Sequence, residues 1–176
     1  MDTTNLAHLY SLPALDWTQI HARLDAEITQ EPGSGGPDRH TCWLTTINPD
    51  GSPLVTGIGA LWVDGAFWFE TGERTRKGKN LDRDPRCALS VATHEFDLTV
   101  NGAAVQITDP QTVAAMAARW AAGGWPARVD DTGHAITAEF SAPSAGPPPW
   151  HVYRLTPHSA SAVATVPPGG ATSWRF

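Results

Sequence analysis

The spacing of apolar residues along the chain first fits a helix and then fits strands. Between residues 14 and 30, apolar residues recur every three or four positions, which places them on one face of a helix. Asp16 stands just before this pattern and has the side chain of an N-cap. We therefore predict a helix over residues 14–30, followed by a Gly- and Pro-rich connector at residues 31–37. The apolar face consists of Trp17, Ile20, Leu24 and Ile28.

From residue 42 onward, apolar residues run in short blocks that are separated by turn residues. Asn-Pro-Asp-Gly at residues 48–51 is typical of a turn, and Asp64-Gly65 is a strong signal for a two-residue hairpin. The pattern predicts three antiparallel strands joined by short loops, at residues 42–47, 53–63 and 66–71.

The second half of the chain predicts more strands and one clear helix. Asp109-Pro110 supplies an N-cap and a first-turn proline, and Gly123-Gly124 ends the helix. Residues 125–149 end in a Gly- and Pro-rich run, so we predict a long irregular loop of the kind that often forms a lid or binding loop. Short strands, tight turns and few helices favour a mainly β protein with an antiparallel barrel. The further strands are predicted at residues 87–93, 98–107, 150–155 and 160–165.

Composition describes a globular protein with a single domain. The chain has 176 residues and 41% hydrophobic content, and its apolar stretches are too short to span a membrane. Residues 1–38 are predicted to form an N-terminal helix and linker. The first residues lack the pattern of a secretory signal, so we expect a cytoplasmic protein. Cys42 and Cys87 lack CxxC spacing and are interpreted as buried small hydrophobic residues.

Half of the basic charge lies in one short run on an otherwise acidic chain. Of twelve Lys and Arg residues six lie between residues 71 and 86, while the net charge is −6. The run joins a predicted strand to a predicted helix that starts after Thr75 and ends near Asp84, because Pro85 disfavours helix before it. Such a cluster at a helix start predicts a specific anion, most simply a phosphate, and argues against nucleic acid as a partner. The six are Arg74, Arg76, Lys77, Lys79, Arg83 and Arg86.

Several short motifs follow one another in a characteristic order. They are Trp43-Leu-Thr-Thr-Ile47, Pro49-Asp-Gly-Ser-Pro53, Phe69-Glu-Thr71, Thr75-Arg-Lys77, Asn80-Leu81, Asp84-Pro-Arg86 and Gly102. Their order and spacing resemble the flavin-binding split β-barrels related to pyridoxamine 5′-phosphate oxidase, a group that includes FMN proteins and enzymes that use the deazaflavin F420. The resemblance implies a six-stranded antiparallel split β-barrel and a homodimer that holds two cofactors at the subunit interface.

The resemblance also implies which positions contact the cofactor. Thr75, Arg76 and Lys77 match the Ser/Thr-Arg-Lys motif that holds the cofactor phosphate, and Lys79 aligns with a basic position of some F420 proteins. A guanidinium, an ammonium, a hydroxyl and helix-start amides together suit a phosphate dianion. The positions matching the backbone along the ring are Thr56, Gly57, Ile58, Gly59 and Ala60, and those matching a strand end near the phosphate-bearing chain are Glu70 and Thr71.

Two glycines can be interpreted in more than one way, and the C-terminus differs from the family pattern. Gly57 and Gly59 alternate on one strand, where they accommodate either a ring stacked on the strand or a bulge or close inter-strand contact. The C-terminal residues lack the Arg-Leu-His-Asp-Arg-like segment that binds the vitamin B6 substrate, so oxidation of pyridoxamine phosphate is not expected. Arg175 is the remaining candidate for a C-terminal cation at the active site. The tryptophans of the predicted strands fit the core, a subunit interface or a wall for a flat ring.

The sequence thus leads to a functional hypothesis: an F420- or FMN-dependent oxidoreductase that transfers a hydride to or from a small or medium apolar, unsaturated molecule. Arg74, Lys79 and Arg83 are extra cations for the acidic tail of F420, which favours F420 slightly. A non-catalytic carrier of the same cofactor and a binder of another flat ligand, such as haem, remain alternatives. The seven histidines are scattered without metal-ligand spacing, and His94 and His151 are the first to consider.

Overall fold

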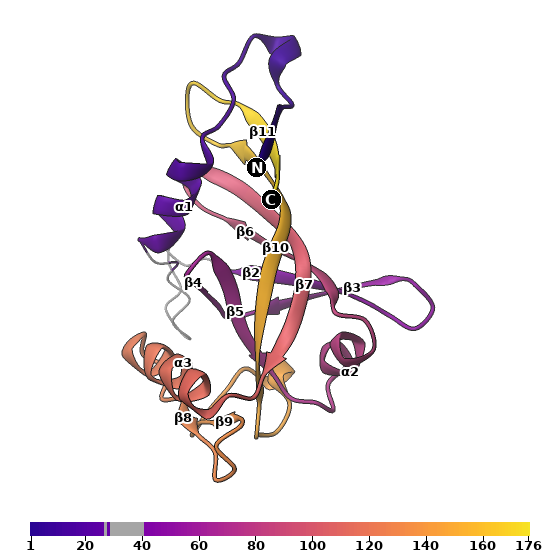
Figure 1. Cartoon of the computed structure of the whole chain (residues 1–176), viewed down its shortest axis with the longest axis vertical. Coiled ribbons are helices and arrows are strands. Elements are labelled where there is room, and N and C mark those ends of the chain that lie inside the picture. Colours follow the sequence, from indigo (N-terminus) through magenta and orange to yellow (C-terminus); the bar gives the residue numbers. More distant parts are fainter. Residues whose placement is uncertain (27, 29–40) are drawn as a thin grey trace.

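The computed structural model of the chain describes residues 1–26, 28 and 41–176. This part is mainly β, with three α-helices and a large antiparallel sheet, which confirms the predicted fold class (Figure 1). The predicted connector at residues 31–37 lies outside the described residues.

The first strands form two hairpins that share one bent segment. Strand β2 (Cys42–Ile47) pairs with β3 (Pro53–Ile58), and β4 (Ala60–Val63) pairs with β5 (Ala66–Thr71). The prediction of one continuous strand over residues 53–63 is therefore wrong. The segment changes its partner at Gly59, where a residue without a side chain lets the backbone bend.

Three longer strands complete the barrel. Strand β6 (Arg86–Ala92) pairs with β7 (Phe96–Ile107), and β7 pairs along its whole length with β10 (His151–Ala164). The prediction of separate strands at residues 150–155 and 160–165 is wrong, because β10 is continuous. Its register shifts between Pro157 and Ser159, and this bulge accommodates the proline that broke the sequence pattern.

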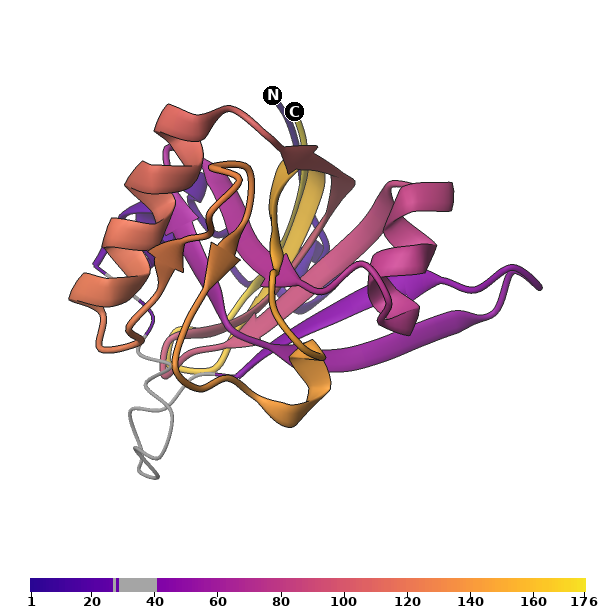
Figure 2. The ribbon, with the colours of Figure 1, turned by 90° about the horizontal axis from the view of Figure 1, so that it is seen from below.

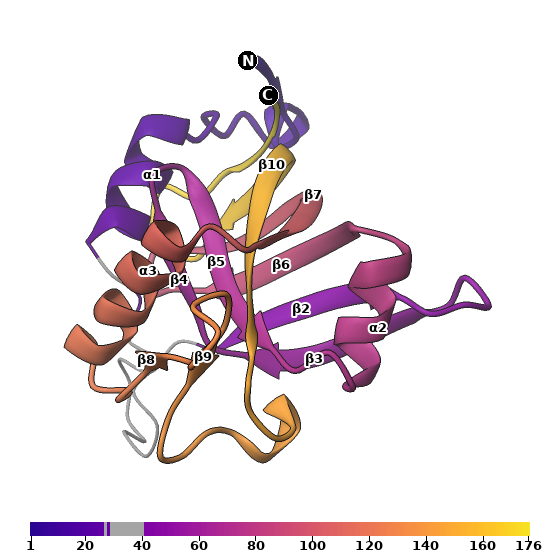
Figure 3. The same ribbon diagram turned by 60° about the horizontal axis from the view of Figure 1, so that its bottom comes forward.

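The order of pairing returns to its starting point. It runs β3–β2–β6–β7–β10–β5–β4, and β4 follows β3 in the chain after Gly59 alone. When β3 and β4 are counted as two halves of one strand, the described residues hold a six-stranded barrel. Strand β10 runs through nearly the full length of the molecule and pairs with both β5 and β7 (Figures 1 and 3).

Two short strands near the chain ends extend the sheet beyond the barrel. Strand β1 (Asp2–Asn5) pairs with β11 (Ala171–Arg175), and β11 pairs with the end of β10. The sequence did not predict either strand, because β1 is polar and largely exposed and neither shows an extended apolar alternation. The two chain ends consequently lie side by side (Figures 1 and 3).

The three helices begin at capping residues that the sequence indicated. Helix α1 (Trp17–Asp25) starts at Asp16, which accepts a hydrogen bond from the Thr18 amide, and α3 (Pro110–Ala122) starts at Asp109, which accepts one from the Thr112 amide. Helix α2 (Arg76–Arg83) starts at Thr75. Helix α1 begins later and ends earlier than the predicted range of 14–30, of which residues 27, 29 and 30 lie outside the described residues. Two single 3-10 turns, η1 (His8–Tyr10) and η2 (Pro143–Ala145), are also present.

Both faces of β5 are buried, which creates two cores. Phe67 and Phe69 lie in the barrel interior with both cysteines, which are buried as predicted and form no disulfide in the described part of the chain. Trp68 faces the other way and packs with α3 and Trp150. Helices α3 and α2 lie on opposite sides of the barrel (Figure 2).

The segment predicted as an irregular loop at residues 125–149 is partly regular. It contains a short hairpin of β8 (Arg128–Val129) and β9 (Ile136–Thr137), followed by η2. Trp125 and Ile136 are buried in the core against α3, which explains why this stretch is ordered around apolar anchors. None of the helices in the described part of the chain is long and apolar enough to cross a membrane.

Candidate anion site at the start of α2

The turn between β5 and α2 is closed by two threonine hydroxyls. Thr75 donates to the Gly72 carbonyl and accepts from the Gly78 amide at 3.0 Å, and the hydroxyl of Thr71 lies 2.9 Å from that of Thr75. A hydroxyl has one donor and two acceptor positions, so these three contacts occupy the Thr75 hydroxyl fully. Thr75 therefore shapes the helix start and has no hydrogen-bonding capacity left for a ligand in this conformation.

Asn80 fixes α2 against the turn between β2 and β3. Its side chain is buried and donates to the Thr46 hydroxyl at 3.0 Å and to the Asn48 side-chain oxygen at 3.1 Å. Arg83 donates to the Ile47 carbonyl on the same strand end. The sequence singled out Asn80 only as part of a motif, because a buried amide at this position gives no local pattern.

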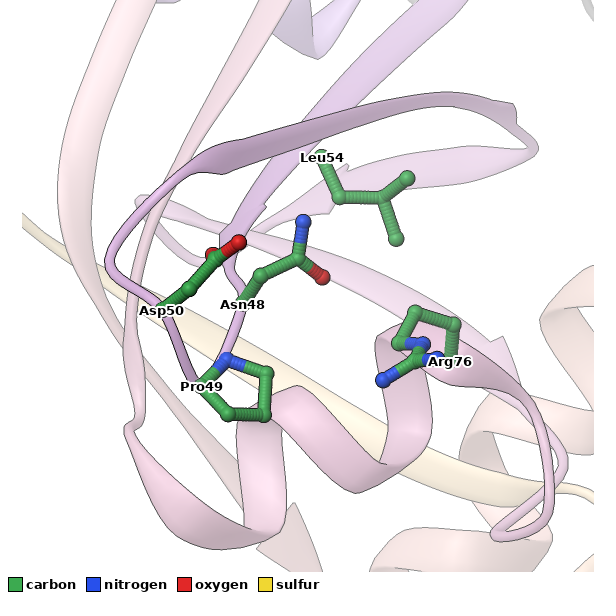
Figure 4. Close-up of a pocket in the computed structure, with 5 residues that line it drawn as sticks. All are labelled: Asn48, Pro49, Asp50, Leu54 and Arg76. Atoms are coloured by element: carbon green, nitrogen blue, oxygen red, sulfur yellow. The ribbon is translucent and has the colours of Figure 1, made fainter.

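A cavity of about 420 Å³ lies between this turn and the first residue of α2. Figure 4 shows the Arg76 side chain of α2 facing residues of the β2–β3 turn across it. Hydrogen bonds from the Ser52 hydroxyl and amide hold the pKa of Asp50 below its usual range, and the Arg76 charge contributes less. The lining residues are Asn48, Pro49, Asp50, Leu54 and Arg76.

The predicted cations of this site divide into exposed and buried ones. Arg74, Arg76 and Lys79 are exposed around the helix start. Lys77 is only 4% exposed, and its Nζ donates to the Ser144 carbonyl at 2.7 Å. Burial lowers the pKa of Lys77, and the nearby Glu70 carboxylate opposes that shift. The structure therefore gives Lys77 an internal partner that the sequence did not predict.

Glu70 lies at the end of β5 beside this buried ammonium. Burial raises the pKa of Glu70 to about 8, although the Lys77 charge acts to lower it. In the described part of the chain Glu70 and Lys77 form no direct ion pair, and they interact through their charges at longer range. Glu70 and Thr71 lie at the end of β5, and the Thr71 hydroxyl contacts that of Thr75 at the helix start; their place beside a phosphate-bearing chain stays a prediction.

The predicted ring-binding strand has two different faces. Thr56 lies opposite Leu44 and shares its face of β3 with Leu54, which lines the cavity. Gly57 lies opposite Trp43 on the other face, where a Cβ at Gly57 would meet the Trp43 ring at 3.6 Å, an ordinary contact. The two glycines are therefore not on the face of the cavity, and Gly59 is the point where the strand bends.

The Thr56 hydroxyl is buried without a hydrogen-bond partner among the described residues. β3 also ends the order of strands, so within the described chain its outer edge has no strand partner. Ile58 and Ala60 flank the bend at Gly59. An unpaired hydroxyl and a free strand edge beside the cavity can supply hydrogen bonds to a ligand that extends from Arg76 along β3.

Arg175 and the two histidines lie away from this cavity or at its margin. Arg175 is on β11, which lies away from α2, so one chain does not bring it to the site (Figures 1 and 3). His151 lines a small cavity of about 110 Å³ beside the β5–α2 turn, while His94 is exposed at the β6–β7 turn. Among the described residues, no group of three His, Cys, Asp or Glu side chains could hold a metal ion.

Comparison with protein families identifies one match. The family model described as pyridoxamine 5′-phosphate oxidase matches residues 34–164 of the chain. Among curated proteins, none matches the chain significantly.

Solved structures with a similar fold belong to several bacteria. A pyridoxamine 5′-phosphate oxidase-related, FMN-binding protein from Nostoc punctiforme is 16% identical, with a TM-score of 0.60 and coverage of 93% of either chain. A relative of general stress protein 26 from Clostridium acetobutylicum is 12% identical, with a TM-score of 0.58 and coverage of 90% of this chain and 93% of that one. A protein of the NimC/NimA family from the same bacterium is 12% identical, with a TM-score of 0.55 and coverage of 89% and 91%. At these identities the likeness concerns the fold.

Proposed function

Since the chain belongs to the pyridoxamine 5′-phosphate oxidase family, we propose that it binds a flavin-type cofactor, F420 or FMN, at the start of α2. In this proposal the protein is an oxidoreductase that transfers a hydride to or from a small or medium apolar, unsaturated molecule. The observation that carries the proposal is the cavity between Arg76 and the β2–β3 turn.

The residues around this cavity fit a phosphate group. An exposed guanidinium at the first position of α2 stands beside helix amides that have no partner within the helix. Lys79 is exposed one position beyond the first turn and adds a second positive charge. Arg76 and Lys79 would therefore hold the phosphate, while Thr75 and Lys77 are already bonded within the protein.

The strand next to the cavity fits the rest of such a cofactor. Leu54 and Thr56 face the same side of β3, so a ring system that extends from the phosphate can lie against one apolar and one hydroxyl side chain. A hydrogen bond to a ring heteroatom would remove the cost of the unpaired Thr56 hydroxyl, which is on the order of 1–3 kcal/mol.

Bound flavin-type cofactors supply the hydride carrier, and the protein supplies binding, orientation and exclusion of water. The proposal therefore needs no acid or base side chain at the reacting atoms. It does not include oxidation of pyridoxamine phosphate, because the C-terminal residues differ from the segment that binds that substrate.

The choice between FMN and F420 depends on cations beyond the phosphate. Arg74 and Lys79 are exposed and available for an acidic tail, whereas Arg83 is bonded to the Ile47 carbonyl. The F420 form of the proposal thus relies on Arg74 and Lys79. Shortening the tail of F420 should weaken binding if these cations receive it.

Parallel titration of the purified apo-protein with FMN and F420, followed by tryptophan fluorescence, tests the proposal. We expect binding at micromolar affinity or better. An Arg76→Ala variant should lose about 1.5–3 kcal/mol of binding free energy, the scale for a hydrogen bond to a charged group. Arg119→Ala, on the exposed side of α3, is the matched control and should bind normally. Binding of neither cofactor would contradict the proposed function. Equal cofactor affinity of Arg76→Ala and Arg119→Ala would show that Arg76 does not contact the cofactor.

A further inference from the structure

Residues 141–149, called the strap below, lie across the turn between β5 and α2. The Gly72 amide donates to the Ala145 carbonyl at 3.1 Å, and the Trp150 indole donates to the Gly146 carbonyl at 2.9 Å. A Cβ at Gly72 would come within 2.9 Å of the Ala145 carbonyl oxygen, so the strap packs against this turn without spare room.

Lys77 joins the strap to the helix that starts the anion site. Its backbone belongs to the first turn of α2, whereas its ammonium is buried on the Ser144 carbonyl. Helix side chains lean toward the N-terminal end of their helix, so the same ammonium can be directed to an anion at the first amides of α2. The ammonium can therefore bind either the strap carbonyl or an anion, and the two compete for it.

Lys77 is bonded to Ser144 through an uncharged acceptor, the backbone carbonyl. A backbone carbonyl carries a partial charge, whereas a phosphate carries a full one and forms stronger, charge-assisted hydrogen bonds with an ammonium. Burial of Lys77 also disfavours its charged form. Both effects favour transfer of the ammonium to an anion when one binds.

We propose that Lys77 and the strap form an anion-operated latch: an anion bound at the start of α2 draws Lys77 away from the Ser144 carbonyl and thereby loosens residues 141–149. This inference rests on the proposed function for the identity of the anion, the phosphate of F420 or FMN. The fastening of the strap by Lys77 is a property of the protein without ligand.

Such a latch couples cofactor binding to the opening of a small cavity beside the β5–α2 turn. The cavity lined by Gly146, Pro147 and His151 lies under the strap, so loosening the strap opens this side of the turn when the cofactor is in place. By thermodynamic linkage, a change that loosens the strap while keeping Lys77 must also strengthen anion binding. The latch thus predicts a fastened strap without the anion and a loosened strap with it.

Hydrogen exchange of the Gly72 and Ala145 amides, which bond to or within the strap, reports whether it is fastened. The full chain is compared without ligand and with FMN, F420 or inorganic pyrophosphate, and binding is followed separately by tryptophan fluorescence. Lys77→Met removes the ammonium, and Arg119→Met is the control because Arg119 is an exposed cation on α3, outside the anion site.

We expect exchange in unliganded Lys77→Met to be about tenfold or more faster than in the natural chain, the scale for one charge-assisted hydrogen bond. Unliganded Arg119→Met should match the natural chain. A saturating anion should accelerate exchange in the natural chain and in Arg119→Met, but cause no further acceleration in Lys77→Met.

Three results would overturn the latch. They are equal exchange in the three unliganded proteins, unchanged exchange when FMN or F420 is bound, and no acceleration by any of the three anions. The second leaves the proposed function intact. Acceleration by pyrophosphate without binding of either cofactor would support the latch and contradict the proposed function.

Discussion

At the scale of single residues, burial separates the cations of the basic run that are available to bind an anion from Lys77, which forms a contact within the protein. Arg74, Arg76, Lys77 and Lys79 lie around the start of α2, whereas Arg83 is the last residue of that helix and Arg86 is the first residue of β6. The sequence could not show that Lys77 points inward, because its partner is a backbone carbonyl 67 positions later. Because Lys77 fastens the strap through the Ser144 carbonyl, Lys77→Ala should loosen the strap.

Glu70 makes the stability of the protein depend on pH. Its pKa is raised by burial from 4.5 to about 8, so the folded chain retains a proton there that the unfolded chain has lost. The contribution of this group is therefore complete below about pH 4.5 and is lost as the pH rises to about 8. Glu70→Gln should flatten the decline of Tm over that interval.

Thermal unfolding between pH 4.5 and pH 9 measures this effect for both proteins. The exposed Glu139→Gln is the control and should keep the decline of the natural chain. Parallel curves for the natural chain and Glu70→Gln would show that Glu70 ionises normally.

At the scale of elements, the contact between α2 and the β2–β3 turn positions both walls of the anion cavity. Asn80 makes this contact with two hydrogen bonds from a buried side chain. Asn80→Ala should lower the free energy of unfolding by about 1–3 kcal/mol, since buried acceptors on Thr46 and Asn48 lose their donor. Binding of the cofactor should weaken as the walls separate.

Urea unfolding and the cofactor titration measure the two effects of Asn80→Ala. Asn101→Ala is a suitable comparison, because Asn101 is exposed and its amide only reaches the Ser159 hydroxyl at 3.5 Å. A variant with normal stability and normal cofactor affinity would show that α2 is positioned by other contacts.

Two glycines in the sheet predict opposite outcomes when alanine replaces them. A Cβ at Gly102 would lie 2.1 Å from the Thr156 carbonyl oxygen on β10, so the strands would have to separate. Gly102→Ala should cost about 1–3 kcal/mol or more of stability, the range for overpacking. Gly57→Ala only approaches the Trp43 ring at 3.6 Å and should not lower stability.

Urea unfolding of the two variants distinguishes these sites. Should Gly57→Ala prove as unstable as Gly102→Ala, the outer face of β3 would be tighter than the structure indicates. Normal stability of Gly57→Ala together with lost cofactor affinity would instead place a ring on that face.

At the scale of the whole molecule, the sequence predicted the barrel better than its ends. Hairpin signals such as Asp64-Gly65 are local, so β2 and β5 were predicted within their observed bounds. β1 and β11 stabilise each other across the whole length of the chain, and no window of sequence contains both. The bend at Gly59 and the continuity of β10 likewise depend on which strands lie beside them.

The outer face of β2 and β3 predicts that two copies associate. Trp43 and Val55 are 50% and 57% exposed on this face, on adjoining positions of paired strands. Burial of such a surface against a second copy would be favourable, so we predict a homodimer.

Light scattering after size exclusion should give twice the 18.8 kDa mass of the chain. Replacing Trp43 and Val55 together by serine should shift the protein toward the monomer. The exposed Val163, replaced by serine, is the comparison. A natural chain that elutes as a monomer at micromolar concentration would contradict the prediction.

The length and position of β10 also have a consequence for how the chain folds. The hairpins β2–β3, β4–β5 and β6–β7 form between neighbours in sequence, whereas β10 must dock against β5 across the gap from Thr71 to His151. Contacts that distant in sequence are slow to form. During synthesis the barrel must therefore stay open until residues 151–155, which pair with β5, have left the ribosome, so its closure comes late.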